Sequence, residues 1–156
     1  MTLSIVCVCY IYGMSTSTVS STAAREAWAL FWRLFTADKP RRMATLNHLG
    51  LAPMQSMALM QLQPGEPMPM SALATALMCD NSNVTGIVDR LEAQGLVERR
   101  PAEHDRRVKT LVVTPKGVAL RGEVERQLSV PPPPLADLSE EDAATLRDIL
   151  RRALEV

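Results

Sequence analysis

The chain has 156 residues, of which 47% are hydrophobic and 22% charged, and its formal net charge at pH 7 is zero. This size and composition fit one ordinary globular domain. The zero balance excludes a uniformly basic protein, so any argument for nucleic acid depends on local charge. All six aromatic side chains lie within the first 35 residues, which argues against a stacking surface for single-stranded nucleic acid.

The sequence lacks the patterns of catalysis and of metal binding. His48 and His104 have no paired ligand nearby, and no Ser/His/Asp set, carboxylate pair or glycine-rich phosphate loop is present. We therefore predict no enzyme, no cofactor and no metal site. Cys7, Cys9 and Cys79 are too few and too unevenly spaced for a disulfide framework, which favours a reducing cytoplasm.

The first fourteen residues are apolar but resemble neither a signal peptide nor a membrane span. No positive charge precedes them, no clear cleavage signature follows, and the run is too short to cross a bilayer as a helix. Together with the Ser/Thr-rich stretch that follows, residues 1–22 are expected to form a flexible extension, with Met14 as an alternative start. A regulator tethered to a membrane through residues 1–14 is the weakest alternative, and no membrane partner is expected.

A helix is expected at about 23–37, before Lys39-Pro40. Trp28, Phe31, Trp32 and Phe35 follow its period, so the four rings share one face. No earlier element offers this face a surface to pack on, so it is interpreted as an interface with a partner helix.

Shorter helices are expected at about 41–49, 53–62 and 69–77, with Gly50 and the turn cluster at 64–67 between them. This region is rich in methionine, at positions Met54, Met57, Met60, Met68, Met70 and Met78. We interpret these side chains as core filler, and the alternative is an adaptable pocket for a hydrophobic ligand.

A further helix is predicted at about 83–94, after a connector at 79–82 and before Gly95. Its apolar stripe consists of Val84, Ile87, Val88 and Leu91. Two strands, at about 96–99 and 108–113, then flank a polar turn and form a hairpin. Residues 99–109 contain five basic and two acidic side chains, a net charge of +3.

Two more helices are expected after the hairpin. Thr114 and Pro115 begin a helix that reaches about residue 128, and Ser139 begins the last helix at about 140–154. Between them, Pro131–Pro134 is expected to be a semi-rigid spacer that cannot be helical.

Short helices followed by a basic hairpin indicate a winged helix-turn-helix. Opposite its apolar stripe, the helix at 83–94 has a small polar surface that suits the major groove of double-stranded DNA. Ser82, Asn83 and Thr85 are expected to hydrogen-bond to base edges or phosphates, and Arg90 to meet a phosphate. Taken alone, the helix is better interpreted as an ordinary amphipathic helix with a solvated polar face, and the adjacent basic hairpin shifts the interpretation to DNA.

The tip of the hairpin contains Asp105, Arg106 and Arg107. One of the two arginines is expected to enter a narrow minor groove, where the negative potential is deepest. Asp105 could hold the turn through backbone N–H groups or pair with an arginine. The alternative is a solvated charged hairpin.

The segments DNSNVTGIVDRLEAQGLVERR and PAEHDRRVKTLVVTPKG, within residues 79–117, resemble the MarR family of bacterial regulators. The resemblance implies a mainly α fold with a small antiparallel β-hairpin, in one domain at 23–156. The winged helix-turn-helix core would span about 53–114. Dimerisation helices would lie at its N- and C-terminal sides, at about 23–37, 115–128 and 140–154.

The resemblance also implies a homodimer that regulates transcription, most simply as a repressor, from a palindromic DNA site. Ser82, Asn83, Thr85 and Arg90 fall at DNA-contact positions of the family, and Asp105 and Arg107 match its Asp-x-Arg wing. Gly86 stands where many relatives carry a longer side chain, so base reading there is expected to be weak. Ala52 replaces the usual Ser/Thr cap, which is expected to weaken the next helix by about 1 kcal/mol.

Release from DNA by a small aromatic or hydrophobic ligand is a further implication, with Trp28, Trp32, His48 and Met57 as candidate contacts. Two alternatives remain open. One is a thiol-based oxidant sensor that uses Cys79 or the pair Cys7 and Cys9, and the other is a protein-interaction winged helix that does not bind DNA.

Overall fold

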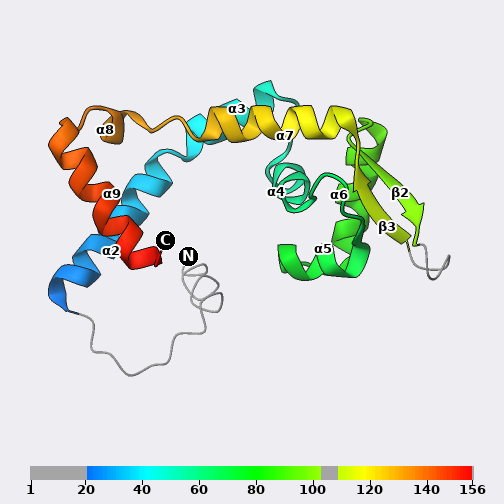
Figure 1. Cartoon of the computed structure of the whole chain (residues 1–156), viewed down its shortest axis with the longest axis horizontal. Coiled ribbons are helices and arrows are strands. Elements are labelled where there is room, and N and C mark those ends of the chain that lie inside the picture. Colours follow the sequence, from blue (N-terminus) through cyan, green and yellow to red (C-terminus); the bar gives the residue numbers. More distant parts are fainter. Residues whose placement is uncertain (1–20, 103–108, 156) are drawn as a thin grey trace. The chain divides into compact units, whose positions relative to one another are not determined.

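The computed structural model describes residues 21–102 and 109–155. Its elements, in chain order, are α2 (Thr22–Ala37), α3 (Lys39–His48), α4 (Pro53–Gln61), β1 (Met68–Pro69), α5 (Met70–Leu77), α6 (Asn81–Ala93), β2 (Val97–Pro101), β3 (Lys109–Val113), α7 (Pro115–Leu128), α8 (Pro133–Ala136) and α9 (Glu140–Leu154) (Figure 1). The predicted mainly helical fold with a small antiparallel sheet is confirmed. The chain divides into two compact units, the first ending at Ala37 and the second beginning at Asp38.

The sheet has three antiparallel strands in the order β1-β3-β2. β2 and β3 form the predicted hairpin, with Val97 opposite Val113 and Pro101 opposite Lys109. β1 was not predicted, because the sequence analysis began a helix at Pro69. A two-residue strand that contains proline has no periodic pattern, and pairing with β3 alone defines it, with Pro69 opposite Thr110.

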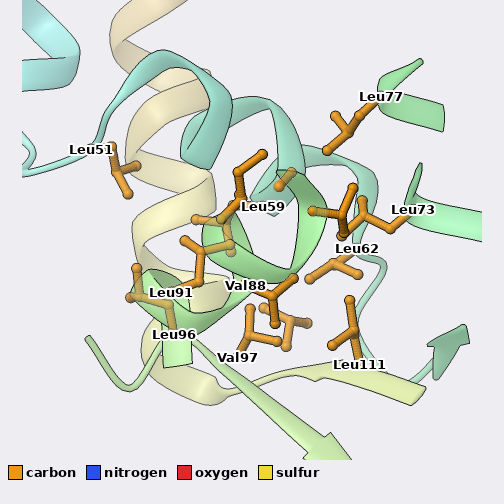
Figure 2. Packing of buried hydrophobic residues seen from close by; sticks show 14 of the residues in the cluster. Leu51, Leu59, Leu62, Leu73, Leu77, Val88, Leu91, Leu96, Val97 and Leu111 are labelled. Atoms are coloured by element: carbon orange, nitrogen blue, oxygen red, sulfur yellow. The ribbon is translucent and has the colours of Figure 1, made fainter. Parts of the chain in front are cut away.

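One hydrophobic core unites α4, α5, α6 and the sheet (Figure 2). The side chains that Figure 2 labels are Leu51, Leu59, Leu62, Leu73, Leu77, Val88, Leu91, Leu96, Val97 and Leu111. All four residues of the predicted α6 stripe are buried, which confirms that periodicity. Because this stripe is fixed against α4 and α5, the opposite side of α6 faces solvent.

Side-chain caps set the start of the two long C-terminal helices where the sequence placed them. The Thr114 hydroxyl accepts a hydrogen bond from the Gly117 amide at 3.0 Å, and the Ser139 hydroxyl accepts one from the Asp142 amide at 3.1 Å. Gly117 also allows α7 to approach the sheet closely. A Cβ atom there would collide with the Leu96 carbonyl and lie 2.7 Å from Val113 Cγ2.

Several boundaries differ from the predictions. α6 begins at Asn81 rather than at 83, with Asp80 as its N-cap. α3 begins at Lys39 with Pro40 in its first turn. The expectation that the proline run cannot be helical is wrong for α8, which starts at Pro133. Both proline effects have the same cause, since the first turn of a helix does not need the missing N–H group.

The start of α4 is stabilised without a Ser/Thr cap. Ala52 makes no side-chain cap, as expected, but Gln55 Oε1 accepts a hydrogen bond from the Ala52 amide at 2.7 Å. The Gln55 side chain is only 5% exposed. This bond supplies half of a capping box and offsets part of the expected weakening.

The interpretation of the methionines as core filler is correct for some and wrong for others. Met60, Met68 and Met70 pack against the core. Met54 and Met57 are exposed, because α4 instead buries Gln55, Ser56, Ala58 and Leu59. Met78, at 65% exposed, is also outside the core. α4 is apolar on most sides, so its sequence alone does not identify the buried face.

α2 carries the predicted aromatic face. Ring centroids are 5.6 Å apart for Trp28 and Phe31 and 5.9 Å apart for Trp32 and Phe35, and no residue of this helix is buried. Within residues 21–102 and 109–155, no helix is long and apolar enough to cross a membrane.

Candidate nucleic-acid interface

The N-terminal half of α6 is the centre of the candidate interface. Met78 adopts a left-handed conformation (φ 49°) and ends α5, so the chain turns within two residues to the Asp80 N-cap of α6. On the solvent side of α6, the exposed residues include Asn81, Ser82, Asn83, Thr85, Asp89 and Arg90. The structure therefore places the four predicted polar residues of this helix, Ser82, Asn83, Thr85 and Arg90, on one accessible surface.

Asn81 belongs to the same surface, although the sequence analysis left it in the connector. Its backbone carbonyl accepts a hydrogen bond from the Thr85 hydroxyl at 2.9 Å. The Thr85 proton is thereby used within the helix, and its side chain offers an outside partner a methyl group and oxygen lone pairs. The signal for Asn81 was present, since Asp80 is as good an N-cap residue as Ser82.

Gly86 leaves the middle of this surface open. A Cβ atom at this position would meet no atom within 4 Å. The absence of a side chain is therefore not required by packing within the chain. It gives the helix a shallow, smooth region where another molecule can come close to the backbone.

Arg99 of β2 joins the hairpin to α6. Its guanidinium lies 2.5 Å from Asp89 Oδ1 and 2.5 Å from Glu92 Oε2, and Glu92 Oε1 accepts a hydrogen bond from the Arg99 amide at 3.2 Å. Partial burial lowers the pKa of Arg99, but the bond to Asp89 and the attraction of both carboxylates raise that pKa above its ordinary value. Arg99 is therefore held as a cation between the two elements.

These contacts change the charge estimate for the hairpin. Arg99 is compensated by two carboxylates, and Arg100 is paired with Glu98 at 2.8 Å. Neither arginine is a free cation for a partner, although both contributed to the predicted +3. Lys109 is exposed at the start of β3. Asp105, Arg106 and Arg107 lie outside the described residues.

The candidate ligand contacts are accessible within their own units. Trp28 is 55% and Trp32 39% exposed in the first unit, and His48 and Met57 are exposed in the second. The Cys79 thiol is half-buried and donates a hydrogen bond to the Leu77 carbonyl, with 3.4 Å between sulfur and oxygen. Cys7 and Cys9 lie outside the described residues.

Comparison with known proteins supports the architecture. The MarR family model matches residues 51–109. The chain is 30% identical over 146 residues to the uncharacterized HTH-type transcriptional regulator YfiV of Bacillus subtilis (strain 168), covering 88% of each chain. The matched length is well beyond that of the family model.

Solved structures agree in fold. A MarR family protein from Bacillus stearothermophilus has a TM-score of 0.73 at 24% identity, covering 88% of this chain and 97% of that one. The MepR-DNA complex of S. aureus has a TM-score of 0.59 at 18% identity, covering 80% and 98%. With the family model on the helix-turn-helix and hairpin and a full-length relative at 30% identity, the chain belongs to the MarR family of transcriptional regulators.

Proposed function

We propose that this chain regulates transcription in the cytoplasm by binding double-stranded DNA sequence-specifically. The observation that carries the proposal is the exposed polar surface of α6, fixed beside the hairpin by Arg99. With α6 in a major groove, Ser82 and Asn83 would read bases or hold phosphates, and Thr85 would contact a base through its methyl group or oxygen lone pairs. The structurally similar MepR of S. aureus has been crystallised with DNA, which supports DNA as the partner.

Gly86 and Arg90 would have different roles in this arrangement. Gly86 would let the DNA come close to the helix backbone, and Arg90, one turn further along, would meet a phosphate. The hairpin would follow the flanking minor groove, with Arg107 as the inserted residue and Asp105 and Arg106 beside it.

The active species is proposed to be a homodimer. The aromatic face of α2 is exposed, and α9 has no buried residue although it carries large apolar side chains such as Ile149, Leu150 and Leu154. Such surfaces suit a second copy of the chain. Two recognition helices about 34–36 Å apart would then read a palindrome with half-sites one turn apart.

Within the dimer, 53–114 would be the DNA-binding core, and α2, α7 and α9 would be the dimerisation helices of a single domain at 23–156. The regulatory outcome is proposed to be repression that a small aromatic or hydrophobic ligand relieves. Trp28, Trp32, His48 and Met57 are the proposed contacts for that ligand.

The test begins with selection of duplexes from random DNA by the purified chain, followed by electrophoretic titration at several salt concentrations. We expect a palindromic consensus, and affinity that falls steeply with salt because phosphate contacts release counterions. Arg90→Ala should lower affinity about tenfold on all duplexes, whereas Arg33→Ala, on α2, should not change it.

A chain that enriches no sequence and binds random duplexes without salt dependence would not be a DNA regulator. It would then be a protein-interaction winged helix. Peroxide treatment tests the alternative release mechanism. If peroxide abolishes DNA binding and Cys79→Ser prevents that loss, release occurs through oxidation of the Cys79 thiol and not through a ligand.

A further inference from the structure

A hollow of about 360 Å³ with a mixed polar and apolar lining lies beside the exposed polar surface of α6, between α5, α6 and β3. Its lining residues are Pro69, Met70, Ser71, Asn81, Thr85 and Lys109. The pairing of β1 with β3 positions this wall, since Pro69 is opposite Thr110, the neighbour of Lys109. The hollow is therefore held by the sheet on one side and by the first turns of two helices on the other.

Three hydrogen-bond donors line the hollow from three different elements. The Ser71 hydroxyl comes from α5, the Asn81 amide from α6 and the Lys109 ammonium from β3, and all three residues are exposed. Across residues 21–102 and 109–155, none of these side chains has a hydrogen bond or ion pair within the chain. They are available to an outside acceptor.

The charge of the hollow is positive. Among the described residues, no carboxylate lines it, and Lys109 is the cation in its lining. The contrast with the adjacent hairpin is clear, because Arg99 and Arg100 are both held by carboxylates. A site with one lysine, one hydroxyl and one amide suits a singly charged group with several acceptor oxygens, which a phosphodiester is.

We propose that this hollow holds one backbone phosphate of the DNA, between the major groove that α6 enters and the flanking hairpin. The inference rests on the proposed function and adds Lys109, Ser71 and Asn81 to the interface. These residues act on the register and affinity of α6 on the duplex. They do not read sequence, because phosphates carry no base identity.

The experiment compares Lys109→Gln with the wild-type chain on the selected duplex and on two sequence variants of it. Loss of one phosphate contact should lower affinity about tenfold on all three duplexes. It should also reduce the slope of log K against log salt by about one for each subunit. Lys39→Gln, on α3, makes the same change in net charge and should retain the wild-type slope.

Ethylation interference identifies the phosphate itself. We expect one ethylated phosphate in each half-site to block the wild-type chain but to have little further effect on Lys109→Gln and Ser71→Ala. Retention of the wild-type salt slope by Lys109→Gln would overturn the inference, and so would a change in base preference without a change in slope. Either result leaves DNA binding intact, whereas a wild-type chain that binds no DNA refutes the proposed function instead.

Discussion

The winged helix-turn-helix and the terminal helices differ in whether they bury their apolar side chains. Leu59, Leu73, Val88 and Leu91 are fully buried between α4, α5, α6 and the sheet. By contrast, α2 and α9 bury no residue at all within the described chain. One region therefore buries its apolar side chains within a single chain, and the other leaves them exposed, as the proposed dimer would require. The comparison predicts that substitutions in the core mainly lower stability, whereas substitutions in the terminal helices mainly weaken assembly.

The largest effect on stability is expected in the core. Leu59→Ala should lower the free energy of unfolding by about 2–5 kcal/mol, because it removes a fully buried side chain and leaves a cavity. Urea unfolding followed by circular dichroism measures this change. Met57→Ala, on the exposed side of the same helix, should cost less than about 1 kcal/mol. Equal losses would show that the faces of α4 are assigned incorrectly.

A smaller effect on folding but a large effect on assembly is expected for α2. Trp28→Ala should weaken dimerisation by about 2 kcal/mol or more, because aromatic side chains dominate such interfaces. Sedimentation across a concentration series should show the dissociation constant rising about thirtyfold, while the helical signal of the core remains. Glu26→Gln, away from the aromatic face, is the control. If the unsubstituted chain sediments as a monomer, the terminal helices do not form an interface and this comparison between the two regions is wrong.

The smallest effect is expected where the second unit begins. Asp38 accepts hydrogen bonds from Arg41 at 2.6 Å and from Arg42 at 3.0 Å. The bond from Arg41 holds the pKa of Asp38 below its ordinary value of 3.8. The folded state therefore favours the ionised carboxylate. Its contribution is present above pH 4 and is lost as the pH falls through the lowered pKa.

Asp38→Asn should accordingly lower stability at pH 7 by at most about 1 kcal/mol and lower it less at pH 3. Denaturant unfolding at the two pH values measures the difference. Asp148→Asn, at a more exposed ion pair on α9, should show a weaker pH dependence. A loss for Asp38→Asn that is the same at both pH values would assign the effect to packing and not to charge.

Local chemistry allowed much of the fold to be predicted. Thr114 and Ser139 mark helix starts because their hydroxyls cap backbone N–H groups, and Gly95 marks an end because its φ is +68°. The start of α6 was missed because Asp80, Asn81, Ser82 and Asn83 are four adjacent residues that all cap helices well. Local sequence alone does not choose between them.

The geometry of the candidate interface could be predicted only where it depends on one helix. The exposed face of α6 follows from its own buried stripe, so Asn83, Thr85 and Arg90 could be placed from periodicity. The contacts of Arg99 could not, because its carboxylate partners lie seven and ten residues away and meet it only after the hairpin packs on α6. A count of basic residues therefore overestimated the charge that the hairpin offers to DNA.

Gly86 lowers the stability of α6 at its exposed surface. A glycine inside a helix costs roughly 0.5–1 kcal/mol relative to alanine, and the space around it is empty. Since no described atom would meet a Cβ atom here, the missing stability is recoverable by a single substitution with alanine. Any side chain added at Gly86 would project from the exposed surface of α6, so under the proposed function a substitution here can change the preference for an operator while the core of the protein stays intact.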